Sequence, residues 1–160
     1  MSQAASGPSM LSLLPRGLSG LEHLRALLAS GRQPPIHETL DIALVSADEG
    51  MVVVQARPSQ RHINPAGIVQ GGYMAAVLDA ACGCAVHSVL APDTGFSTLE
   101  LKIAYHCAVT SGTGVVRAEG RVLSSGRRAA FSEAKLFDAD KRLLASASSS
   151  LLIVPFVTEA

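Results

Sequence analysis

A long apolar segment with one acid at its centre constrains the fold more than any other feature of this sequence. Between residues 62 and 92 the only Asp, Glu, Lys or Arg is Asp79. The segment opens with Gly71 and Gly72 and continues mainly with Ala, Val, Leu, Met and Cys. Its length and its all-round hydropathy predict a buried helix over 71–90. Because an unpaired carboxylate is costly to bury, Asp79 is a candidate functional residue.

The same segment approaches the length of a membrane span, which is the alternative to a buried helix. However, Asp79 stands at its middle, and no basic flank marks a cytoplasmic side. We therefore expect a soluble cytoplasmic protein without a membrane partner. Cys82 and Cys84 lack the usual C-x-x-C spacing, so we interpret the cysteines as reduced core thiols. A site formed by Cys84, His87 and His106 is an alternative that the spacing does not require, and we expect no metal.

The remaining sequence predicts a short helix and six strands around the apolar segment. Residues 1–16 predict a flexible tail, and 17–160 predict a single domain. Leucines at helical spacing over 18–28, followed by Ser30 and Gly31, predict an amphipathic helix. Apolar or alternating runs predict strands at 39–47, 51–57, 96–106, 115–123, 129–137 and 143–154.

These elements together predict an α+β fold. Strands joined by short turns pair as antiparallel neighbours, and we expect this of the four consecutive strands over 96–154. A sheet must have one face covered, and only the helix over 71–90 is apolar enough to be wrapped by it. The prediction is an antiparallel sheet of about five to six strands around one central helix. In the strand at 96–106, strict alternation places Ser97 on the face of Leu101 and Tyr105, and Thr98 on the opposite face.

Composition and missing motifs exclude several classes of function. Formal net charge is zero, no long basic run is present and Trp is absent, so we expect no nucleic-acid partner. The sequence contains no G-x-S-x-G motif, which argues against serine-hydrolase chemistry. A phosphate-binding loop and a dinucleotide fingerprint are also missing from the sequence.

Asp79 and the glycine pair offer complementary chemistry on one helix. At about 100° per residue, Asp79 shares a face mostly with small residues, so another group could approach it. The first amides of a helix lack internal acceptors and lie at the positive end of its dipole. Gly71 and Gly72 allow close approach to these amides, which suits an oxyanion. The combination indicates acyl transfer or hydrolysis, and a simple loop-to-helix turn at the glycines is the alternative.

The segment N-P-A-G-I-V-Q-G-G, with Asp79 nine residues after Gln70, resembles the active-site segment of hotdog-fold acyl-CoA thioesterases of the phenylacetate-degradation type. The resemblance extends over about 21–154 and includes the strand G-F-S-T-L-E-L-K-I-A-Y. It implies the hotdog fold and hydrolysis of acyl-CoA thioesters with aryl, short-chain or medium-chain acyl groups. No cofactor is implied, because CoA is part of the substrate. Asp79 would activate water or attack the thioester, and the amides of Gly71 and Gly72 would bind its carbonyl oxygen.

The resemblance also implies roles for residues around Asp79. Asn64 would position the substrate or water, and Ser97 matches a family position where a hydroxyl orients the nucleophile. Two subunits would pair, as a homodimer or within a homotetramer, so that Asp79 faces Asn64 of the partner subunit. Gln70 stands where many members have His, and Gln can hydrogen-bond a carbonyl but cannot titrate.

Candidates for binding the phosphates of CoA are Arg61, Arg127 and Arg128, since phosphates require cations or amides. A solvated turn arginine is the alternative for the last two. Two other functions stay open on the same fold. One is a hydratase or dehydratase, although no Asp here has the His at the D-x-x-x-x-H offset that such enzymes commonly use. The other is a non-catalytic acyl-CoA binder.

Overall fold

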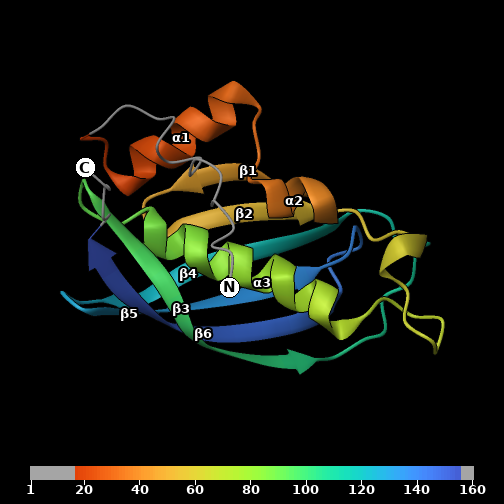
Figure 1. The fold of residues 1–160 in the computed structure, drawn as a ribbon. Helices are drawn as coiled ribbons and strands as arrows, with labels where there is room; N and C mark the ends of the chain where they lie inside the picture. The colour runs from red at the N-terminus through yellow and green to blue at the C-terminus, as the bar shows by residue number, and fades with distance from the viewer. Residues whose placement is uncertain (1–16, 156–160) are drawn as a thin grey trace, which may run out of the picture.

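A six-stranded antiparallel sheet curls around a single long helix in the computed structural model, which describes residues 17–155 (Figure 1). The strand order is β1-β2-β4-β5-β6-β3, and every neighbouring pair is antiparallel. The elements in chain order are α1 (Gly20–Ser30), α2 (Pro35–Leu40), β1 (Ile42–Asp48), β2 (Met51–Ala56), a 3-10 helix (Gln60–His62), α3 (Gly71–His87), β3 (Thr94–Tyr105), β4 (Val116–Ser125), β5 (Ala129–Phe137) and β6 (Leu143–Pro155). The predicted α+β architecture is confirmed. The predicted tail at 1–16 lies outside the described residues.

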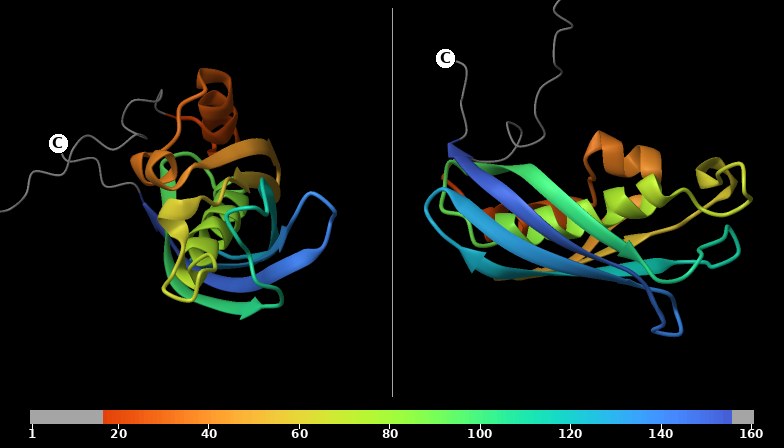
Figure 2. Two further views of the ribbon diagram at one scale, coloured as in Figure 1. Left: turned by 90° about the vertical axis from the view of Figure 1, so that its right-hand side faces the viewer. Right: turned by 90° about the horizontal axis from the view of Figure 1, so that it is seen from below.

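Helix α3 lies in the concave face of the sheet, as two further views show (Figure 2). Its sheet-facing residues Val77, Leu78 and Ala81 have no exposed surface. The helix lies directly on β4 because a glycine stands at the crossing point. A Cβ atom added to Gly120 would clash with the carbonyl oxygen of Ala81. The position of α3 over the sheet is therefore fixed by backbone contact.

The predicted helix over 18–28 is observed as α1. Ser19 caps it, and Glu22 completes a capping box by accepting from the backbone amide of Ser19. The amide of Gly20 donates to the carbonyl of Leu90 just beyond α3. Helices α1 and α2 pack beside β1, which is one edge of the sheet. The other edge is β3, which among the described strands pairs only with β6.

Two sequence-based predictions about the strands are wrong. A strand was predicted from residue 39, but α2 occupies residues up to Leu40, because Pro35 presets the helical φ at its first position. Asp41 then adopts the left-handed conformation, with φ of 53°, and ends the helix before β1 begins. The strands β3 and β4 were predicted to be neighbours, but β3 pairs with β6 and β4 with β2. Residues 106–115 do not form a tight hairpin; the carbonyl of Val109 instead accepts from the amide of Val69, near the start of α3.

Strand β3 carries one extra residue that changes which side chains face the helix. Thr98 lies opposite Leu151, and the register shifts between Thr98 and Glu100, so Leu99 is the inserted residue of a β-bulge. Leu151 is fully buried, which places Thr98 on the inner face, whereas Leu99 is 62% exposed. Strict alternation predicts that Ser97, and not Thr98, shares the inner face with Leu101. The bulge reverses that grouping.

Candidate active site

Asp79 lies in the middle of α3 and is half-buried. Its Oδ1 atom accepts a hydrogen bond of 3.0 Å from the hydroxyl of Thr98 on β3. Ala75 and Ala76, one turn before it, and the adjacent Ala80 are likewise only partly buried, whereas Cys82 and Gly83, one turn after it, are buried. The carboxylate therefore stands on the side of α3 that the chain's own sheet leaves open.

The hydroxyl that contacts Asp79 comes from Thr98, whereas the resemblance assigned this role to Ser97. Ser97 is exposed and pairs with Leu152, whose side chain lies on the opposite face of the sheet from Leu151. The difference of one position follows from the bulge at Leu99. Sequence reasoning missed Thr98 because two hydroxyl residues stand side by side, and local alternation favours the wrong one.

The first turn of α3 lacks a side-chain cap. Gln70 occupies the N-cap position and makes no capping hydrogen bond, and its side chain is exposed. Gly71 and Gly72 are the first two helical residues, whose amides have no acceptor within a helix. Gly72 is exposed and Gly71 is partly buried. The amides of this turn can therefore donate hydrogen bonds to an approaching oxyanion.

The loop before α3 holds the side chain of Asn64 in one orientation. Its Oδ1 atom accepts from the amides of Ala66 at 2.9 Å and Ile68 at 3.4 Å. The backbone amide of Asn64 donates to the carbonyl of Ile68 at 2.8 Å. Because the carboxamide oxygen is used inside the loop, the NH₂ group is the part of Asn64 that a ligand or a second chain would meet.

A buried aromatic pair supports this loop from the core side. His62 stacks on Tyr73, with the ring centroids 4.0 Å apart, and its carbonyl accepts from the amide of Gln70 at 2.7 Å. The Nδ1 atom of His62 accepts from the amide of Ser59 at 3.0 Å. Burial lowers the pKa of His62, which favours the neutral imidazole that accepts this bond. The pair fixes the path of the chain into α3.

The three candidate arginines lie toward opposite ends of α3. Arg61 belongs to the 3-10 helix beside the loop that leads into α3. Arg127 and Arg128 form the exposed turn between β4 and β5. That turn adjoins Ala130, which belongs to the same buried cluster as Val86 near the C-terminal end of α3. A helix of this length, 17 residues, spans about 25 Å, so one chain does not bring the three together.

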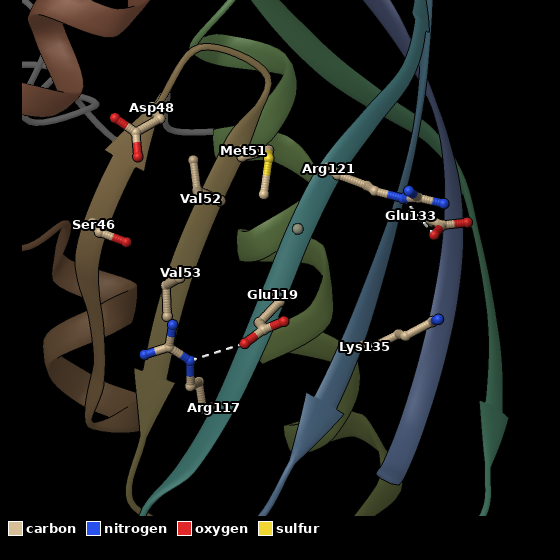
Figure 3. Close-up of a pocket in the computed structure, with 11 residues that line it drawn as sticks. Ser46, Asp48, Met51, Val52, Val53, Arg117, Glu119, Arg121, Glu133 and Lys135 are labelled. Carbon is tan, nitrogen blue, oxygen red and sulfur yellow. Dashed lines mark hydrogen bonds and ion pairs between the residues drawn. The ribbon is translucent and has the colours of Figure 1, made fainter. Parts of the chain in front are cut away.

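A groove of about 390 Å³ lies on the outer face of the sheet, on the far side from α3 (Figure 3). It crosses β1, β2, β4 and β5 and contains an ion pair of 3.1 Å between Arg117 and Glu119. A second pair joins Arg121 to Glu133 at 2.7 Å. None of the candidate site residues lines this groove. It is a surface of mutually neutralised charges and not the site around Asp79.

The described residues contain no metal-binding group and no membrane-spanning helix. Within 17–155, no three His, Cys, Asp or Glu side chains are grouped so that they could hold a metal ion, and Cys84, His87 and His106 form no such group. None of the helices in this range combines the length and the hydropathy that crossing a bilayer requires.

Comparison with known proteins identifies the family. The model of the thioesterase superfamily matches residues 66–145. Protein PA5202 from Pseudomonas aeruginosa is 30% identical over 76% of this chain and 95% of its own, with a TM-score of 0.71. PaaI from the phenylacetic acid degradation operon of E. coli is 18% identical over 84% of this chain and 96% of its own, with a TM-score of 0.73. The protein smu.793 from Streptococcus mutans, solved with acetyl CoA, is 22% identical over 71% of this chain and 89% of its own, with a TM-score of 0.65.

No curated protein sequence matches this chain. The match of the family model, together with the 30% identity to PA5202, shows that the chain belongs to the thioesterase superfamily. Its fold is the hotdog fold of that superfamily, as the sequence resemblance implied.

Proposed function

We propose that this protein hydrolyses acyl-CoA thioesters to the free acid and CoA, with Asp79 as the base or nucleophile. The observation that carries the proposal is the half-buried carboxylate of Asp79 on the open side of α3, oriented by the hydroxyl of Thr98. Membership in the thioesterase superfamily and the acetyl CoA bound to a structural neighbour support the same class of substrate. The acyl group is aryl, short-chain or medium-chain.

The reaction needs one carboxylate and one oxyanion site at the thioester carbonyl. In one route Asp79 takes a proton from water as the water oxygen attacks the carbonyl carbon. In the other, the carboxylate attacks directly and water then hydrolyses the acyl-enzyme anhydride. In both, the amides of Gly71 and Gly72 stabilise the negative carbonyl oxygen. In the first route the carbon–sulfur bond breaks to give the free acid, and the CoA thiolate takes the proton held by Asp79. In the second route the same bond breaks as the anhydride forms, and the water that later hydrolyses the anhydride supplies the proton for the CoA thiolate.

We propose further that each site is shared between two copies of the chain. Gly71 and Asp79 are eight residues apart, so they are separated by about 12 Å along the axis of one straight helix. A group that acts directly on a reacting carbonyl lies within about 3 Å of it, so the Gly71 amide and the Asp79 carboxylate of one α3 cannot both contact the same carbonyl. A second copy would supply the missing partner, with its Gly71 amide and its Asn64 beside the Asp79 of the first.

The free edge of β3 is the surface on which such a pair would form. An unpaired edge strand is a ready template for another strand, and β3 borders the open side of α3. Antiparallel pairing of two β3 edges would lay two α3 helices side by side in opposite directions. Because the two α3 helices would run in opposite directions, the turn with Arg127 and Arg128 of one copy would then lie near Arg61 of the other copy. All three arginines therefore stay candidates for binding the phosphates of CoA.

The test is a thiol-release screen with phenylacetyl-CoA, benzoyl-CoA, acetyl-CoA and hexanoyl-CoA. We expect release with at least one substrate, and a loss of about 100-fold or more in Asp79→Asn, at unchanged circular dichroism and melting temperature. Full activity of Asp79→Asn contradicts the role of Asp79. Stable binding of acyl-CoA without cleavage would identify a binder, and hydration of an enoyl-CoA without thiol release would identify a hydratase.

Mixed oligomers test the shared site. Asp79→Asn and Asn64→Ala are each expected to be inactive, yet a hybrid dimer would contain one site with both native residues. Random reassociation of equal amounts should therefore restore about a quarter of the wild-type activity. If the mixture stays inactive although hybrids are demonstrated by mass spectrometry, the two residues do not act across the interface.

A further inference from the structure

Tyr105, the last residue of β3, connects the sheet to the first turn of α3. Its hydroxyl donates a hydrogen bond of 2.9 Å to the carbonyl oxygen of Gly71. Its backbone is held in register opposite Ala145 of β6. The next two backbone amides both donate to the carbonyl of Leu144, at 2.9 and 3.1 Å. The Tyr105 hydroxyl is therefore presented to α3 from a fixed point on the sheet.

The ring of Tyr105 also packs closely against Gly71. A Cβ atom at position 71 would lie 3.2 Å from the ring carbon Cζ and 3.2 Å from the hydroxyl oxygen of Tyr105. Contacts at that distance require the neighbour to move, so the glycine and the tyrosine are matched in shape as well as by the hydrogen bond. About half of the Tyr105 side chain stays exposed beside the opening turn of the helix.

Among residues 17–155, no other side chain hydrogen-bonds to the backbone of the opening turn. Two consecutive glycines have unusual backbone freedom, and the N-cap residue Gln70 forms no capping bond. A catalytic amide must nevertheless point in one direction, because its value lies in being oriented before the reaction begins. Tyr105 supplies a restraint from outside the helix at the residue where it is most needed.

We propose that Tyr105 is a positioning residue for the oxyanion-binding amide of Gly72, an inference that rests on the proposed thioester hydrolysis. The carbonyl of Gly71 and the N–H of Gly72 belong to one planar peptide group, so a bond that fixes the first also fixes the direction of the second. Hydrogen bonding to the carbonyl oxygen also polarises the peptide and strengthens its N–H as a donor. Tyr105 thus acts on the reaction through the Gly71–Gly72 peptide without touching the substrate.

The test compares Tyr105→Phe with a matched control, Tyr73→Phe. Both variants lose one phenolic oxygen and keep the ring. Tyr73 follows Gly72 directly, but its hydroxyl is buried and has no hydrogen-bond partner among the described residues. We expect Tyr105→Phe to lower kcat about three- to tenfold with KM changed less than about twofold, and Tyr73→Phe to leave kcat unchanged.

Inhibitor binding separates positioning from a general structural effect. A CoA ketone analogue, in which a methylene stands between sulfur and carbonyl, retains the oxygen that the amides bind, whereas the matching thioether lacks it. We expect Tyr105→Phe to weaken the ketone about three- to tenfold and to leave the thioether unchanged, so that the ratio of the two affinities falls. An equal loss for both inhibitors, or activity of Tyr105→Phe equal to that of Tyr73→Phe, overturns the inference. A wild-type protein that releases no thiol overturns the proposed function itself, which is a separate outcome.

Discussion

The hydrogen bond from Thr98 to Asp79 gives the most direct test of the site geometry. Thr98→Val replaces the hydroxyl by a methyl group of similar size and leaves the strand otherwise unchanged. A hydrogen bond to a charged group contributes about 1.5–3 kcal/mol, and each 1.36 kcal/mol is a factor of ten in rate. Because Asp79 is only half-buried in the single chain, we take the lower half of this range. Thr98→Val should then lower kcat about 10- to 50-fold.

Two companion variants make the assay decisive. Thr98→Ser keeps the hydroxyl and should recover most of the activity, while Ser97→Ala removes the neighbouring exposed hydroxyl and should have little effect. Thiol release under saturating acyl-CoA measures kcat, and thermal unfolding identifies any variant whose loss reflects instability. The reasoning is refuted if Thr98→Val stays within about twofold of wild type, or if Ser97→Ala is impaired as strongly as Thr98→Val.

Three further predictions concern the loop, the helix contact and acid stability. Asn64→Ala should lower both the melting temperature and kcat, whereas Asn64→Asp keeps the acceptor for the loop amides and should lower kcat alone. Gly120→Ala would press its Cβ atom against the carbonyl of Ala81 and should lower the free energy of unfolding by about 1–3 kcal/mol, measured by urea titration. Gly112→Ala, whose Cβ atom would make only ordinary contacts, serves as the control. Burial lowers the pKa of His87 to about 4 from its ordinary 6.5. Between pH 6.5 and pH 4, His87 is therefore protonated in the unfolded chain but neutral in the folded chain. Stability should therefore fall as the pH drops from 6.5 to 4, and His87→Gln should flatten that slope in melting curves.

The central helix and its acid could be predicted because their signals are local. An apolar run bounded by Gly71 and Pro92 needs no knowledge of the rest of the chain, and a lone carboxylate in that run stands out in any context. The long helix is observed from Gly71 to His87, three residues shorter than predicted. Its burial against the sheet follows from the same hydropathy.

The features that the sequence did not predict depend on contacts between distant segments. Strand β3 follows α3 in the chain but pairs with β6, the last strand, and no local pattern in 96–106 encodes that pairing. The bulge at Leu99 is visible only in the register with β6. The sequence of β3 alone therefore does not show whether Ser97 or Thr98 faces α3. The tie from Tyr105 to Gly71 joins residues 34 positions apart and has no sequence signature.

The bulge at Leu99 has a consequence for the comparison of sequences in this superfamily. The inserted residue shifts the register by one position only, so the parts of β3 before and after Leu99 both stay paired with β6. An alignment of this chain with a relative whose strand is regular must therefore open a one-residue gap at Leu99. Without that gap, matching from the glycine at 95 pairs every later residue of the strand with the wrong counterpart. Residue roles transferred from relatives to β3 of this chain should be counted backward from Tyr105, from which the register is continuous as far as Glu100.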